Sequence, residues 1–79
     1  MSPTELLAAA GVAMFGGQWK AGLARSLSVT DRTINRWLSE RIEPRPGVIA
    51  DLIVRMKVRR GELDGLIEAA EAYLAETER

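Results

Sequence analysis

The sequence predicts an all-α protein that folds as one domain of five short helices. Three observations support this prediction. The chain has 79 residues, which is the size of a single small domain. Apolar residues recur three to four positions apart in several segments, and no segment alternates apolar and polar residues as a half-buried strand does. Gly and Pro cluster between these segments, where they end helices.

The first helix is predicted over residues 3–15, before two consecutive glycines that break it. Ser2 and Glu5 provide a capping box at its start, and a proline suits its first position. Gly11 is expected to end or weaken this helix. The second helix is predicted over residues 18–27. The apolar residues expected on the inner faces of these two helices are Leu6, Leu7, Ala10, Met14, Trp19, Leu23, Ala24 and Leu27.

The third helix is predicted from Thr30 to about residue 40 or 41. Thr30 is the expected N-cap, and Asp31 follows it where the helix dipole favours a carboxylate. On a helical wheel, the side that packs inward consists of Ile34, Trp37, Leu38 and Arg41. The opposite side, which faces solvent or a ligand, consists of Arg32, Asn35, Arg36 and Ser39.

Two further helices are predicted over residues 48–60 and 62–77, with a proline-containing loop at residues 43–47 before them and Gly61 between them. Basic residues crowd the last turns of the fourth helix, where the dipole favours cations. Its expected inner stripe is Ile49, Leu52, Ile53 and Met56. The apolar stripe of the fifth helix is Leu63, Leu66, Ile67, Ala70, Tyr73 and Leu74. This stripe packs either on the fourth helix of the same chain or on its symmetry mate in a dimer.

The composition excludes several classes of site. The chain has no Cys and no His, which removes disulfides, a zinc site and imidazole catalysis. No Gly-rich phosphate loop is present, so we expect no enzyme, no cofactor and no small-molecule ligand. No apolar run reaches the ~20 residues of a membrane span, and the N-terminus lacks the basic region of a signal peptide. These features favour a cytoplasmic protein.

The net charge is zero, but the charges are unevenly distributed. Residues 18–60 hold ten Lys or Arg against four acidic residues, and residues 61–79 hold six acidic residues and one Arg. A basic middle and an acidic tail indicate that the two segments meet different partners. The alternative is that they are two solvated faces of opposite sign.

The predicted second and third helices, joined by a short turn, have the arrangement of a helix-turn-helix. Residues 20–38 resemble the DNA-binding helix-turn-helix family of the phage repressor and Cro type. The family pattern has a small residue in the first helix that lets the two helices approach, a hydrophobic residue after the turn and two buried residues in the second helix. The matching residues here are Ala24, Val29, Ile34 and Trp37. The resemblance implies a lambda-repressor-like domain, with the helix-turn-helix at about residues 19–41 and its second helix in the major groove.

One turn position departs from the family pattern. The family favours Gly there because the backbone is left-handed, and this chain has Ser28. A serine adopts that conformation at a cost of roughly 1 kcal/mol. The expected backbone of Ser28 is therefore left-handed.

A wider segment is similar to small bacterial helix-turn-helix proteins with the skeleton FG–W–LAR–L–V–RT–RW–P–GV. The stretch VTDRTINRWLSE, residues 29–40, is also similar to the recognition region of anti-CRISPR-associated regulators, which are small autorepressors of mobile genetic elements. Both similarities imply a dimeric transcription regulator that acts on an inverted repeat.

The resemblance also implies which residues contact DNA. They are Lys20, Thr30, Asp31, Arg32, Thr33, Asn35, Arg36 and Arg45. Arg matches the guanine edge and Asn the adenine edge, while Lys20 and Arg45 are expected at the phosphate backbone. Three roles are open to Asp31: it accepts a hydrogen bond from a cytosine amine, it orients Arg32, or it caps the helix. The last two roles, which are structural, are favoured.

The sequence therefore predicts a sequence-specific DNA-binding regulator, a repressor that occupies a palindromic operator of double-stranded DNA. A homodimer held by the fourth and fifth helices would read two half-sites about one helical turn apart. The alternative is a protein-binding helix-turn-helix module or antiactivator that uses the amphipathic C-terminal helix.

Overall fold

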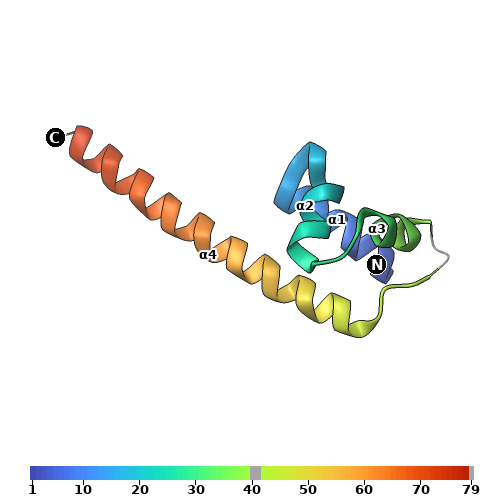
Figure 1. Ribbon diagram of the computed structural model, residues 1–79. Coiled ribbons are helices and arrows are strands. Elements are labelled where there is room, and N and C mark those ends of the chain that lie inside the picture. Colours follow the sequence, from blue (N-terminus) through green and yellow to red (C-terminus); the bar gives the residue numbers. More distant parts are fainter. Residues whose placement is uncertain (40–41, 79) are drawn as a thin grey trace.

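A computed structural model describes residues 1–39 and 42–78 (Figure 1). In these residues the chain is helical and has no strand; its elements are α1 (Pro3–Phe15), the 3-10 turn η1 (Gly16–Gln18), α2 (Trp19–Leu27), α3 (Asp31–Leu38) and α4 (Pro46–Thr77). The all-α prediction is confirmed. The prediction of five helices is wrong, because residues 48–60 and 62–77 belong to the single helix α4. Arg41, expected on the inner side of the third helix, lies outside the described residues.

The two ends of α1 form as the sequence predicts. The Glu5 N–H donates to the Ser2 hydroxyl at 3.1 Å, and the Ser2 N–H donates to the Glu5 carboxylate at 3.1 Å. These reciprocal bonds satisfy donors that the first helical turn cannot pair within itself. The helix ends at Phe15 because Gly16 adopts a φ of 69°, a conformation that favours glycine.

Two glycines let α1 and α2 approach each other closely. Gly11 lies buried inside α1, so the expectation that α1 ends there is wrong. A Cβ on Gly11 would lie 2.5 Å from Cε3 of Trp19, so the tryptophan ring occupies the space that a side chain would need. In the same way, a Cβ on Gly22 of α2 would lie 2.6 Å from Cγ of Phe15. The Trp19 ring of α2 thus packs on Gly11 of α1, and the Phe15 ring of α1 packs on Gly22 of α2.

The helices α1, α2, α3 and α4 contribute to one apolar core, at the end of the molecule where α1, α2 and α3 gather on the first half of α4 (Figure 1). Its buried side chains are Leu7, Ala10, Leu23, Ala24, Ile34, Trp37 and Leu52. The half-buried residues around it are Met14, Phe15, Trp19, Leu27, Val29, Leu38, Val48, Ile49 and Met56. Burial of one such aliphatic side chain contributes ~1.5–3 kcal/mol. Leu6 and Ile53, predicted to face inward, are exposed instead.

Helix α4 runs for 32 residues, and its second half extends beyond the other helices (Figure 1). The molecule is accordingly elongated, with extents of 58 × 22 × 22 Å. Gly61, expected to break the chain into two helices, lies inside α4 with open space around it. A glycine at an exposed helical position costs only ~1 kcal/mol relative to alanine. The strong helix formers on either side of Gly61, including Arg, Glu and Leu, outweigh that cost.

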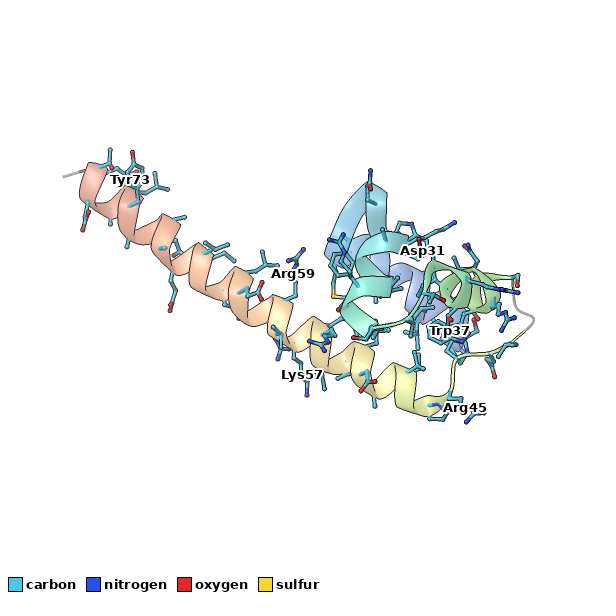
Figure 2. All side chains as sticks on the ribbon, viewed as in Figure 1. Asp31, Trp37, Arg45, Lys57, Arg59 and Tyr73 are labelled. Atoms are coloured by element: carbon cyan, nitrogen blue, oxygen red, sulfur yellow. The ribbon has the colours of Figure 1, made fainter. Side chains whose placement is uncertain are left out.

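Arg59 ties the middle of α4 to the end of α1 (Figure 2). Its guanidinium donates to the Met14 carbonyl, which is among the last carbonyls of α1 and has no partner inside that helix. The same guanidinium lies 5.5 Å from the ring centroid of Phe15. A salt bridge of 3.8 Å also joins it to Glu62. The expectation that the basic residues of 55–60 lie at a helix end is wrong, because α4 continues past them.

Gly11→Ala is expected to destabilise the protein, because the added methyl group overlaps the Trp19 ring. The free energy of unfolding should fall by about 1–3 kcal/mol, the usual cost of overpacking a core. The matched control is Gly61→Ala, at an open position, which should be neutral or stabilise by up to ~1 kcal/mol. Urea denaturation followed by circular dichroism measures both variants. Equal effects of the two substitutions would contradict the packing role of Gly11.

Candidate nucleic-acid interface

The connection between α2 and α3 is a tight turn at Ser28. This residue has φ 56° and ψ 42°, the left-handed conformation that the sequence predicts for it. Its N–H donates to the Arg25 carbonyl at 3.3 Å. The Val29 N–H donates to the Ala24 carbonyl at 2.9 Å, and the two bonds together are a Schellman motif. The motif ends α2 and sets the direction in which the chain enters α3.

Contacts at both ends hold α3 in place. At its start, the Thr33 N–H donates to the Thr30 hydroxyl at 3.2 Å, so Thr30 is the N-cap that the sequence predicts. At its end, the Thr4 hydroxyl of α1 donates to the Trp37 carbonyl at 3.2 Å. Between these contacts Ile34 is fully buried and Trp37 is 8% exposed. Because one side of this short helix is buried, the opposite side necessarily faces outward.

The outward side of α3 is polar and carries two guanidinium groups. Its exposed residues are Asp31, Arg32, Asn35, Arg36 and, just after the helix, Ser39. Arg32 and Arg36 lie one turn apart with equal charge, an arrangement that slightly destabilises an isolated helix and that a bound anion would relieve. Asp31 forms no salt bridge with a described residue, and it occupies the first turn of α3, where the helix dipole favours a carboxylate.

An open depression lies where the start of α2 meets the outward side of α3. Its volume is about 640 Å³, and it is lined by residues 17–21 together with Asp31 and Asn35. Lys20 stands over a neighbouring ring, with Nζ 5.8 Å from the Trp19 ring centroid. The structure therefore brings Lys20 of α2 together with two of the residues predicted on α3.

Gln18 lines the same depression, and it is not among the contact residues predicted from the sequence. It ends η1 directly before α2 and is exposed, and its side-chain amide both donates and accepts hydrogen bonds. The sequence feature that could have identified Gln18 is its position immediately before a helix. Unpaired backbone N–H groups lie at the same helix start. These donors and the Lys20 ammonium make this edge of the depression suitable for an anion.

The depression is not lined by the other predicted contact residues, which are Thr30, Arg32, Thr33, Arg36 and Arg45. Arg45 is the exposed N-cap residue of α4, and in the view of Figure 2 it lies on the other side of Trp37 from Asp31. Thr33 is half-buried, and its hydroxyl lies 3.0 Å from that of Thr30 in a mutual hydrogen bond. Both threonine hydroxyls therefore already serve the start of α3.

The predicted dimer-interface residues lie on the half of α4 that extends beyond the core. The large side chains among them are 52–67% exposed; they are Leu63, Leu66, Ile67, Tyr73 and Leu74. Ala70 is exposed as well. The alternative in which this stripe packs on a preceding helix of the same chain is wrong, because both segments belong to α4.

Comparison of the chain with protein-family models, with curated proteins and with solved structures gives no match. In the part of the chain that the structure describes, no cluster of three His, Cys, Asp or Glu residues is arranged to hold a metal ion. Over residues 1–39 and 42–78, no helix has both the length and the apolar character needed to cross a membrane.

Ser28→Gly is expected to raise the free energy of unfolding by roughly 1 kcal/mol, because glycine adopts the left-handed conformation without the steric cost that a side chain brings. The matched control is Ser26→Gly, two residues earlier and inside α2, which should lower it by up to ~1 kcal/mol. Thermal denaturation of the two variants beside the parent protein measures both changes. A less stable Ser28→Gly variant would contradict the assigned turn.

Proposed function

We propose that this protein is a sequence-specific DNA-binding regulator, in which α2, the turn at Ser28 and α3 form a helix-turn-helix. The observation that supports the proposal most strongly is the burial of Ile34 and Trp37, which turns the polar side of α3 away from the core. The second helix of such a unit enters the major groove of DNA. Arg36 and Asn35 are the residue types that read guanine and adenine edges there.

The depression between α2 and α3 supports a division of roles among the proposed DNA contacts. Lys20 and Gln18 lie beside the outward side of α3, at a helix start that offers backbone donors, which suits contact with a phosphate. The outward residues of α3 would then reach base edges. The carboxylate of Asp31 would be repelled by phosphate, so we assign it to the start of α3, where the helix dipole stabilises it.

A homodimer suits this function for two reasons. A single helix-turn-helix reads only a few base pairs, whereas a two-fold dimer reads an inverted repeat and gains affinity from both halves. The apolar side chains of residues 63–74 also remain exposed in one chain, and a second copy would cover them. Occupation of an operator that overlaps a promoter represses transcription without any additional domain.

The exposed apolar stripe of α4 also supports a second candidate function. It could bind a helix of another protein, as an antiactivator does. Salt dependence separates the two functions. DNA binding through several Lys and Arg contacts weakens steeply as salt rises, whereas binding through an apolar stripe does not.

Selection from random duplexes with the purified protein is expected to enrich an inverted repeat. On that operator Arg36→Ala should weaken binding by about 1–3 kcal/mol and relax base preference at one position of each half-site. Lys20→Ala should weaken binding to all sequences evenly and reduce the salt slope by about 1. The matched control is Lys57→Ala, which removes one charge from the side of α4 that points away from the other helices (Figure 2). If both the Arg36 and the Lys20 variant bind like the parent, α3 is not the recognition helix.

Leu66→Glu is expected to weaken self-association at least tenfold, about 1.4 kcal/mol, because it places a charge within the apolar stripe. The control is Val54→Glu. Val54 is 56% exposed but lies on nearly the opposite side of α4, so its substitution should leave self-association unchanged. Sedimentation equilibrium measures the dissociation constants, and equal losses in the two variants would count against the stripe as the interface.

A further inference from the structure

One face of α4 is buried in its first half and bare in its second half. Positions 49, 52, 56, 59, 63, 66, 70 and 73 are spaced alternately by three and four residues, so they form one continuous stripe along the helix. Its first part packs on the core through residues such as Leu52, and Arg59 bonds to the end of α1. No described residue packs on its second part, where the side chains of Leu66 and Tyr73 are 66% and 67% exposed.

The free half of α4 continues the helix that starts in the core, and its apolar face is not packed against any described residue. Most helical stability in proteins comes from packing of an apolar face. A second helix lying along that face would provide the missing packing.

We infer that the partner is a second copy of this chain and that the two α4 helices pair in antiparallel orientation through residues 63–74. This inference specifies the arrangement of the homodimer in the proposed function. Two independent observations favour it: the distribution of charge along α4, and the position of α1 on the stripe.

The charges along α4 are complementary to those of a reversed copy. The stretch of residues 55–60 is basic, and the stretch of residues 62–78 is acidic. A parallel pair would place like charges beside each other, whereas an antiparallel pair brings the acidic end of one helix to the basic middle of the other. Arg60 and Glu78 lie about five helical turns apart and hence on the same flank of the stripe, so Arg60 of one copy would lie near Glu78 of the other, about two residues further along the helix pair.

The position of α1 disfavours a parallel pair on steric grounds. The end of α1 lies on the same face of α4 as the bare stripe, immediately before it, because Arg59 of the stripe bonds to the Met14 carbonyl. In a parallel pair, α1 of the two copies would compete for the same space. In an antiparallel pair with Leu66 opposite Ala70, residue 76 of one helix lies opposite residue 60 of the other. The partner helix therefore ends where α1 begins to cover the stripe.

Antiparallel pairing puts the two α3 helices at opposite ends of the helix pair. With a rise of 1.5 Å per residue, the starts of the two α4 helices would be about 66 Å apart, roughly two turns of B-DNA. The proposed half-sites would then be centred farther apart than the single turn that the sequence predicts. This consequence rests on the proposed function, but the pairing itself does not.

Disulfide trapping without DNA tests the pairing, because the chain has no native cysteine. A disulfide requires Cα atoms within about 7 Å. In the antiparallel pair, residue 63 lies opposite residue 73 of the partner, and identical positions are about 15 Å apart. Leu63→Cys and Tyr73→Cys should therefore fail to cross-link when oxidised separately and should form a disulfide-linked dimer when mixed before oxidation. In a parallel pair the reverse holds.

Sedimentation equilibrium of the parent and of both reduced cysteine variants completes the test. A dimeric parent, dimeric variants and cross-linking only in the mixture support the inference. Cross-linking of either variant alone, dimers that form no disulfide in the mixture, or a monomeric parent would overturn it. Because no nucleic acid is present, a protein that fails to bind DNA would still give a clear result here.

Discussion

The burial of Ile34 and Trp37 is the interaction on which the remaining structure depends. Helix α3 has only eight residues and would not be stable alone, so it exists because these two side chains pack against α1 and α2. The same packing decides which side of α3 faces outward. Ser28 and Thr30 contribute by ending α2 and starting α3 within a few residues, which leaves little freedom in the relative direction of the two helices.

Helix α4 has two structural roles that meet at Arg59. Before this residue, α4 completes the core of its own chain through Leu52; after it, the helix leaves the core and presents apolar side chains to the outside. A single helix therefore joins the unit that we propose reads DNA to the surface that we propose binds a second copy. Since α1 already occupies the stripe up to Arg59, the fold of one chain restricts the ways in which another can pair with it.

Features set by a few neighbouring residues could be predicted from the sequence. The capping box at Ser2 and the N-cap at Thr30 are of this kind. The left-handed backbone of Ser28 was expected from the resemblance to helix-turn-helix proteins. Features that depend on distant packing could not. Gly11 looks like a helix breaker until the Trp19 ring is seen against it, and the depression that joins Lys20 and Gln18 to α3 exists only because α2 and α3 pack together. The continuity of α4 through a glycine depends on the helix formers on both sides, which a single-residue rule does not weigh.

The central claim is that the side of α3 opposite Ile34 and Trp37 meets nucleic acid. Titration of isotope-labelled protein with an enriched DNA duplex, followed by backbone amide NMR, tests this claim most directly. We predict that the largest chemical-shift changes fall on Arg32, Asn35 and Arg36 and on the start of α2, with little change beyond residue 63 of α4. Shift changes confined to α4, with α3 unaffected at low salt, would contradict it.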